Sequence, residues 1–482
     1  MAHPHRFLLL ALCLAPALLR AHVGSPDIYA QGQAGPYSVF VTVRPPAVIP
    51  GVAQVELRVL SGDVRGVHLV PLPLTGLGKN FPPTPDVAMR DKADPTRFTG
   101  SLWLMAFGSF EVRLDLDGAQ GHGAFAVPVP ALSTRVYSMQ KNTSLLLLGF
   151  MLFLVVGLVS IVGAAFRDAR LDAGLSPTPR RRHQAWAVMA AMLVFCGGVL
   201  WLGNWWWSSE ADNYRHNIYK PLDLAAILQG NQLHLQLHDP GWLKLRQLDD
   251  LVPDHGHLMH LFLVRLPGLD RMAHLHPDMV ATGRFTVDLP TLDAGHYTLY
   301  ADIVHENGLA ETAVATLDTA PITGVPLQGD DSQAVASPLQ NAADSSEFPL
   351  DEGIRMVWTS PTSEIRARRP ELFTFEVHDA AGNRVDDLEP YMGMAGHAEF
   401  IRSDGQVFAH VHPSGSAAMA AMLLAQMPPA HDMSMMTMPQ ELTFPYGIPS
   451  AGRYRVFVQI KRHGQIQTAY FDFTSYDRPP SR

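Results

Sequence analysis

Cysteine is scarce: the 482 residues include only Cys13 and Cys196, each inside an apolar run. The chain can therefore build neither a disulfide framework nor a cysteine-based zinc site. Charged residues are also few, at 17%, and the net charge is -9. Because the one dense basic run is Arg180-Arg181-Arg182, a nucleic-acid partner is not expected.

Proline and glycine are abundant, with 38 residues each, and so are histidine and methionine, with 22 and 20. Frequent proline and glycine suit short strands joined by tight turns, and 482 residues exceed one ordinary domain. We expect a mainly β protein with three immunoglobulin-like β-sandwich domains plus a two-helix transmembrane hairpin. Any metal ligands must be His, Met or carboxylate groups.

The first 21 residues have the pattern of a signal peptide, with an apolar run from Phe7 to Leu19 and small residues near the end. Cleavage after Ala17 fits the pattern more regularly than cleavage after Ala21. The mature chain is therefore expected outside the cytoplasm.

Two later apolar stretches, 144–166 and 185–207, are each long enough to span a bilayer, which takes about 20 residues. The segment between them, 167–184, carries five Arg and no Lys, which favours a cytoplasmic loop. The protein is therefore expected in the cell (inner) membrane, with its large domains on the extracytoplasmic side. The alternative is a buried helical pair in a large soluble core.

Residues 22–135 alternate apolar and polar side chains between proline and glycine turns, which predicts an exported β-sandwich. Residues 213–320 and 350–476 repeat one another, since HLMHLFLVRLPGLDRMAHLHP in the first copy matches MAGHAEFIRSDGQVFAHVHP in the second. Both copies are predicted to be sandwiches. The segment 321–349, rich in Asp, Ser, Ala and Gln, is predicted to be a linker.

The repeat aligns three histidines of each copy. Residues i and i+2 of a strand point to one face, so each His-x-His motif presents two imidazoles side by side. A hairpin brings the earlier histidine beside them, and imidazole suits copper, zinc, iron and nickel. The alternative is that these histidines are structural and bind no metal. The two predicted metal sites are His260, His274 and His276 in the first copy, and His397, His410 and His412 in the second, with His255 and His257 as further ligands in the first copy.

The second copy also contains a methionine-rich insertion, which holds seven Met and His431 between residues 419 and 438. Soft thioethers favour Cu(I), so copper is expected rather than zinc. The alternative is an amphipathic lid with Met419, Met422, Leu423 and Met427 buried. If cleavage follows Ala21, the amino group and imidazole of His22 add a chelating pair. The proposed thioether ligands are Met433, Met435, Met436 and Met438.

The order of motifs in the two copies resembles YtkA-like and FixH-like envelope domains: a His-x-His-Pro turn, Gly-x-Phe, an apolar-Pro run, then Ala-Gly-x-Tyr before an alternating strand. The resemblance is best over Met259–Ile303 and His397–Ile460. It implies small immunoglobulin-like sandwiches with a binding or accessory role, linked to copper handling or cytochrome oxidase assembly. Two sandwiches after a transmembrane hairpin depart from the single-domain pattern.

These patterns predict a membrane-anchored extracytoplasmic protein that binds or handles copper and is not an enzyme. Its expected partners are the membrane and a metal transporter or a cytochrome oxidase assembly system. One alternative is an interaction scaffold or assembly factor of the envelope with structural histidines. Another is a copper enzyme, although the chain lacks a Gly-x-Ser-x-Gly elbow and a zinc-protease helix motif.

Overall fold

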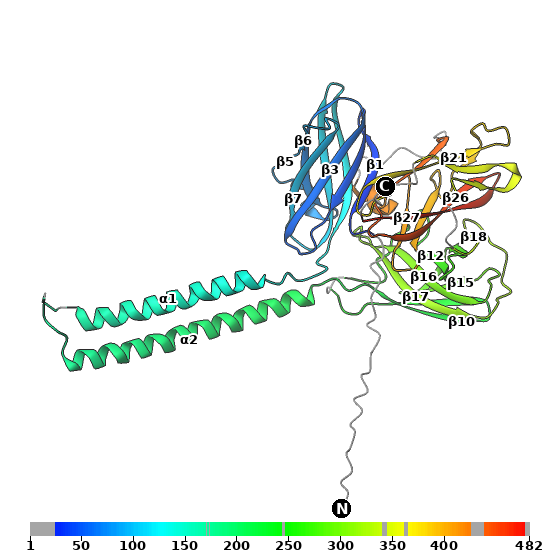
Figure 1. Ribbon diagram of the computed structural model, residues 1–482. Coiled ribbons are helices and arrows are strands. Elements are labelled where there is room, and N and C mark those ends of the chain that lie inside the picture. Colours follow the sequence, from blue (N-terminus) through cyan, green and yellow to red (C-terminus); the bar gives the residue numbers. More distant parts are fainter. Residues whose placement is uncertain are drawn as a thin grey trace, which may run out of the picture.

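Three β-sandwiches and a pair of long antiparallel helices make up the molecule (Figure 1). The mainly β fold class expected from the sequence is confirmed, together with the two apolar helices. The predicted signal peptide lies outside the described residues. The computed structural model describes residues 25–169, 171–172, 174–242, 246–339, 345–360, 365–425 and 438–477.

The N-terminal sandwich packs a five-stranded sheet, in the order β1-β2-β3-β7-β6, on a four-stranded sheet in the order β5-β4-β8-β9. Strand β3 illustrates why these residues form a sandwich: Ala53, Val55, Leu57 and Val59 are buried and alternate with polar residues. The elements are β1 (Ile28–Ala34), β2 (Tyr37–Arg44), β3 (Gly51–Ser61), β4 (Val64–Pro73), η1 (Leu77–Asn80), β5 (Asp86–Val87), β6 (Met89–Arg90), β7 (Arg97–Leu104), β8 (Gly108–Gly118) and β9 (Gly121–Ala131).

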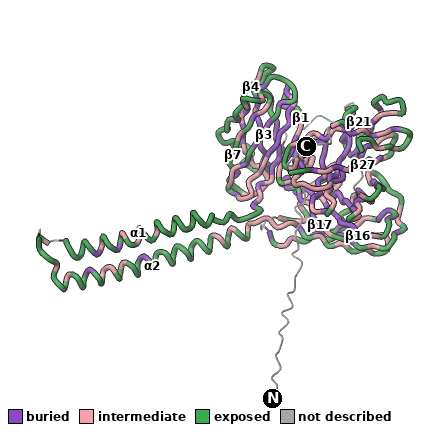
Figure 2. The backbone as a smooth tube through the Cα atoms, in the orientation of Figure 1, coloured by how far each residue is buried: buried purple, intermediate pink, exposed green. Residues whose placement is uncertain are grey.

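Helices α1 (Lys141–Asp168) and α2 (Pro179–His216) lie side by side and project away from the sandwiches (Figures 1 and 2). Both are long and apolar enough to cross a membrane, and most of their side chains are exposed. Each extends beyond its predicted span. The C-terminal end of α2 meets the N-terminal sandwich, where the Tyr214 hydroxyl lies 2.6 Å from the Ser133 hydroxyl.

The first C-terminal sandwich contains β10 (Asp223–Gln229) to β18 (Ser332–Val335) in one continuous chain of strands, β14-β15-β11-β10-β17-β16-β12-β13-β18. Strand β18 corrects the prediction that 321–349 is only a linker. Ser332 and Ala334 are buried, and the strand pairs with β13. Strand β18 itself, Ser332–Val335, is too short and too poor in large apolar residues to be predicted from its sequence pattern. The other strands are β11 (Gln232–His238), β12 (His260–Leu266), β13 (Arg271–Leu275), β14 (Asp278–Ala281), β15 (Arg284–Asp288), β16 (Gly295–Val304) and β17 (Ala310–Thr319).

The second C-terminal sandwich repeats the central part of the first. Strand β23 lies between β24 and β26, as β12 lies between β13 and β16. His397 pairs with Gln459 where His260 pairs with Asp302. The elements are β19 (Glu347–Pro349), η2 (Asp351–Gly353), β20 (Arg355–Trp358), β21 (Glu371–His378), β22 (Leu388–Glu389), β23 (His397–Arg402), β24 (Phe408–Val411), α3 (Met419–Ala425), β25 (Glu441–Tyr446), β26 (Gly452–Arg462) and β27 (Gln465–Ser475).

The two C-terminal sandwiches meet across a buried apolar interface. The rings of Tyr300 and Phe408 stack with their centroids 4.2 Å apart, and Phe262 also contacts Phe408 at 5.0 Å. Arg455 of the second sandwich donates to the carbonyls of Leu269, at 2.7 Å, and Ser337, at 2.8 Å. These contacts hold the sheets that carry the histidine motifs against each other.

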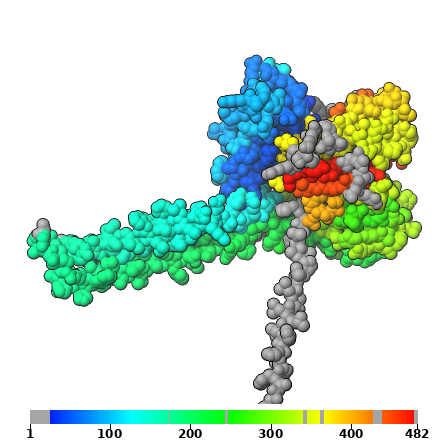
Figure 3. Space-filling model, viewed as in Figure 1, coloured from blue at the N-terminus to red at the C-terminus, as the bar shows by residue number. Residues whose placement is uncertain are grey.

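The N-terminal sandwich is attached to the turn that follows β24. The Gln31 amide donates to Ser414 O at 2.8 Å, and the Ser416 amide donates to Tyr29 O at 2.8 Å. Figure 3 shows the three sandwiches in contact, with the helical pair at one side. The structure therefore brings all three sandwiches close to the second His-x-His motif.

Candidate metal centre

The first predicted set of histidines is assembled by the β12 and β13 hairpin. In this ladder Phe262 lies opposite His274, and Leu261 lies opposite Leu275. This register brings His260, which lies two residues before Phe262 on the same face, beside the imidazoles of His274 and His276. One ring nitrogen of each of these three residues lies within 4.8 Å of the others. We call this set group one.

Each imidazole of group one uses one nitrogen for a fixed hydrogen bond and turns the other toward the group. His260 Nε2 lies 3.0 Å from Asp254 O, so its Nδ1 faces His274 Nε2 at 3.1 Å. His276 Nδ1 lies 2.9 Å from Asp331 Oδ1. Hydrogen bonding to the outer nitrogen is how proteins orient histidine ligands and select their tautomer.

The outer nitrogen of His274 is held by the other sandwich. His274 Nδ1 lies 3.0 Å from Gln459 Oε1, while the Gln459 amide donates to the Ser332 hydroxyl. The amide group is thereby oriented with its oxygen toward His274, which leaves His274 Nε2 for the interior of group one. A residue of the second sandwich thus positions a ligand of the first.

The second predicted set, His397, His410 and His412, also lies together, with ring centroids 4.5 to 5.3 Å apart, and the structure brings His255 of the first sandwich beside it. The structure gathers His397 and His412 with His255 of the first sandwich, with one nitrogen of each within 4.8 Å of the others, and we call this set group two. His255 Nε2 lies 3.3 Å from His412 Nε2, and its Nδ1 lies 2.7 Å from Met392 O. The sequence predicts His255 as a ligand of the first copy, because spacing along one copy cannot indicate that a residue reaches the other sandwich.

His410 lies between the two groups. Its ring centroid is 4.5 Å from that of His412 and 5.3 Å from that of His397, and it is 5.4 Å from that of His260. Its Nδ1 lies 3.5 Å from Asp302 Oδ2. Since Asp302 and Gln459 occupy equivalent positions, each sandwich supports a histidine of the other.

The turn that supplies His255 has a counterpart in the second copy. His255 and Met392 both have a positive φ, 52° and 50°, and each precedes a glycine with positive φ. Both turns close through a pair of backbone hydrogen bonds, between Asp254 and His257 and between Tyr391 and Met394. Met392 and Met394 therefore stand where the first copy has His255 and His257. The aligned motifs Asp-His-Gly-His and Tyr-Met-Gly-Met were the sequence signal for this equivalence.

Burial keeps the clustered imidazoles uncharged. It lowers the pKa of each member of both groups and of His410, to about 3 for His412. The pKa of Asp302 rises to about 7, also through burial. The pKa of Glu399, which lies opposite His410 in the β23 and β24 ladder, is raised well above its usual range for the same reason. Neutral imidazole is the form that binds a metal ion.

Several of these buried nitrogens have no hydrogen-bond partner in the described part of the chain. They are both ring nitrogens of His397, His276 Nε2 and His410 Nε2. A buried polar atom without a partner is costly unless another group satisfies it. Facing nitrogens at 3.1 and 3.3 Å match the spacing of about 3.3 Å between ligands of a tetrahedral ion with bonds of about 2.0–2.1 Å. Both groups therefore fit a metal ion with imidazole ligands.

The methionine-rich insertion is described only in part. Met433, Met435, Met436 and His431 lie outside the described residues, as does His22 at the start of the chain. Met438 packs against the core of the second C-terminal sandwich. In α3, Met422 is buried and Met419 packs on the N-terminal core, which favours the lid interpretation, although Leu423 is exposed.

Helix α3 nevertheless touches the loop that carries His255. Asp254 Oδ1 accepts a hydrogen bond from the Ala420 amide at 2.7 Å, at the start of the helix. The lid, the His255 turn and group two are therefore in mutual contact.

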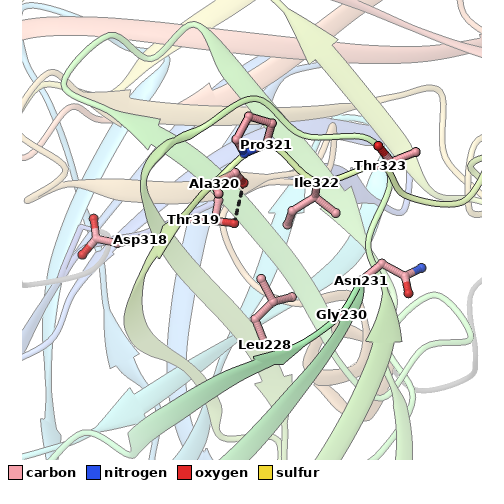
Figure 4. A pocket seen from close by; sticks show the side chains of 9 residues that line it. All are labelled: Leu228, Gly230, Asn231, Asp318, Thr319, Ala320, Pro321, Ile322 and Thr323. Carbon is pink, nitrogen blue, oxygen red and sulfur yellow. Dashed lines mark hydrogen bonds between the residues drawn. The ribbon is translucent and has the colours of Figure 1, made fainter.

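A polar pocket of about 260 Å³ reaches group one from outside and is lined by His276, Asp278, Asp288 and Asp331, among others. Its carboxylates suit an approaching cation. A second pocket, of about 620 Å³, lies between Leu228 and Thr323 and contains no histidine (Figure 4). Asp318 is the one carboxylate among the described residues of its lining, and the Thr319 hydroxyl there donates to Ala320 O at 2.8 Å. The described lining therefore offers no comparable set of ligands.

Residues 351–476, the second C-terminal sandwich, match a family model described as a domain of unknown function, DUF8832. No curated protein matches the chain. The resemblance to YtkA-like and FixH-like domains stays a prediction.

Several solved structures match the chain over most of its length, at low identity and low TM-score. A tetra-tandem repeat from the extending region of a large adhesion protein is 9% identical with a TM-score of 0.17, covering 89% of this chain and 71% of that one. The chicken CNTN1 FN1-FN3 domains are 6% identical with a TM-score of 0.13, covering 93% and 99%. The ICAM-5 D1-D4 ectodomain fragment is 10% identical with a TM-score of 0.14, covering 92% and 77%. No argument about function rests on likeness at these TM-scores.

Proposed function

We propose that this protein binds a transition metal, preferentially copper, in the histidine cluster between its two C-terminal sandwiches. The observation that carries the proposal is the convergence of buried imidazole nitrogens that lack another partner among the described residues. A structural histidine normally satisfies both ring nitrogens or exposes one to water. In group one, by contrast, one nitrogen of each ring is secured and the other is directed at its neighbours.

Copper is favoured over zinc by the composition around the histidines. Imidazole alone suits both metals, whereas thioethers favour Cu(I). Met392 and Met394 occupy the positions of His255 and His257 in the repeat, and both are buried. The predicted ligands Met433, Met435 and Met436 would add thioethers for Cu(I) capture.

The proposed setting is the extracytoplasmic face of the cell membrane. Two helices that are long and apolar enough to span a bilayer support a membrane anchor. The five Arg between the predicted spans support a cytoplasmic loop, and therefore sandwiches on the opposite side. In this setting the protein would store, deliver or sense copper, with a metal transporter or a cytochrome oxidase assembly system as its partner.

A copper titration of the full chain in detergent tests the proposal. The test variant combines His274→Ala and His397→Ala, which removes one ligand from each group. The control variant combines His296→Ala and His463→Ala, whose side chains are 47% and 53% exposed and lie outside both groups. Circular dichroism and thermal unfolding establish that each variant is folded.

The wild type and the control should bind copper stoichiometrically, while the folded test variant should lose most of this binding. Equal copper binding by the test variant would show that the cluster is not the site. Failure of the wild type to bind Cu(I), Cu(II) or Zn(II) would reject a metal-binding function in favour of an interaction scaffold with structural histidines.

A further inference from the structure

We propose that the cluster holds two metal ions at once, as one centre that is complete only when the two C-terminal sandwiches are docked. This inference rests on the proposed metal-binding function and adds the number of ions and their proximity. It follows from three features of the interface: two separate ligand sets, direct contact between them, and ligands that depend on the opposite sandwich.

The two sets have no residue in common. Group one uses His260, His274 and His276, while group two uses His255, His397 and His412. Three imidazoles are sufficient protein ligands for one ion that keeps an open position. Each group can therefore hold its own ion without taking a ligand from the other.

The two sets are in direct contact. The ring centroids of His255 and His260 are 6.0 Å apart, and those of His274 and His397 are 6.5 Å apart. Ions bound to these rings would be close neighbours.

His410 is the residue best placed to add a further ligand to one of the two ions. Its ring lies 5.4 Å from that of His260 in group one and 4.5 Å from that of His412 in group two. Its Nε2 is buried and has no partner within the described chain. Asp302 lies next to its other nitrogen. His410 can therefore complete the coordination of an ion in either group. The repeat predicts it as a ligand because it lies on the same face of its hairpin as His274 does in the first copy.

Each group also depends on the opposite sandwich. Group two takes His255 from the first sandwich, across the interface, and Met392 O holds this ring in place at 2.7 Å. Group one takes its orienting contact, Gln459, from the second sandwich. Because both dependencies cross one interface, separating the sandwiches would open both sites together.

Electron paramagnetic resonance of the Cu(II)-loaded full chain, combined with measured copper content, tests this inference. Two adjacent Cu(II) ions couple their unpaired spins, so the wild type should hold two coppers per chain and show a spectrum altered by coupling. The variants His276→Ala and His412→Ala each break one group. Each should retain one copper and show the spectrum of an isolated ion, while His296→Ala should behave as the wild type does.

The possible failures are distinguishable. One copper per chain in the wild type, or two coppers with the full intensity of isolated spins, would overturn the paired centre but leave the proposed function intact. Absence of bound Cu(II) would also overturn the paired centre, and it would reject the proposed function itself if Cu(I) and Zn(II) likewise failed to bind. Because the decisive spectrum comes from the wild type, the test does not depend on the folding of a variant.

Discussion

Asp331 offers a sensitive test of whether group one is a metal site. Its Oδ1 accepts hydrogen bonds from both His276 Nδ1, at 2.9 Å, and the His276 amide, at 3.0 Å. The His276 side chain is 4% exposed, and that of Asp331 is 22% exposed. The carboxylate therefore fixes the ring and increases the basicity of Nε2, the nitrogen that faces the group, without being a ligand itself.

Removing such a contact usually lowers metal affinity by about 10-fold to 100-fold, or about 1.4 to 2.7 kcal/mol. We expect Asp331→Ala to fall in this range at group one. Asp331→Asn should have a smaller effect, because the amide oxygen still accepts the hydrogen bonds although the negative charge is lost. Competition for copper against a chelator of known affinity measures both changes in the full chain.

Asp318→Asn is the matched control, since Asp318 Oδ1 lies 2.8 Å from Nδ1 of His296 in an exposed pair outside both groups. It should leave copper affinity unchanged. If Asp331→Ala bound both coppers as tightly as the wild type, Asp331 would be only a structural partner of His276, and the proposed role of group one would be refuted.

Three further predictions concern stability and assembly. Burial opposes charge on His305, but hydrogen bonds to Glu311 and Asp250 raise its pKa, so the stability that it contributes is present below about pH 6.5 and lost as pH rises through the folded-state pKa. Denaturation curves of His305→Gln measured across this pH range should lack the decline in stability. A variant with the same pH profile as the wild type would contradict this prediction. Arg455→Ala leaves the Asp472 carboxylate without its partner and should lower the free energy of unfolding by about 3–5 kcal/mol in chemical denaturation. A loss below about 1 kcal/mol, the contribution of an exposed ion pair, would contradict the buried bridge. Gly415→Ala places a Cβ 2.0 Å from Tyr29 O, which would push β1 away from this turn and weaken the hydrogen bond from the Gln31 amide to Ser414 O. Hydrogen exchange at the Gln31 amide should therefore be faster in the variant. Unchanged protection of this amide would show that the N-terminal sandwich docks elsewhere.

Much of the fold follows from local patterns. Alternation in β3 and the apolar lengths of α1 and α2 are properties of consecutive residues, so they predict strands and membrane-length helices directly. Strand β18 was missed because four residues with two small buried side chains carry little periodicity, and its position is determined by pairing with β13.

The candidate site likewise has one part that follows from local sequence and one part that depends on how distant segments dock. The grouping of His260, His274 and His276 could be predicted, because two-residue periodicity and one hairpin determine which faces they share. The role of His255 could not, since it depends on how two sandwiches dock. Asp331 and Gln459 were missed for the same reason: they approach from a different strand or sandwich, and nothing in their local sequence marks them as supports.

X-ray absorption at the copper edge, on the full chain loaded with two equivalents of Cu(II), tests the central claim most directly. Coordination by the histidine cluster predicts a first shell of nitrogen at about 2.0–2.1 Å, the distance typical of imidazole ligands, with the outer-shell scattering of imidazole rings. A first shell dominated by sulfur, or one of oxygen without imidazole scattering, would contradict the claim that these histidines hold the metal.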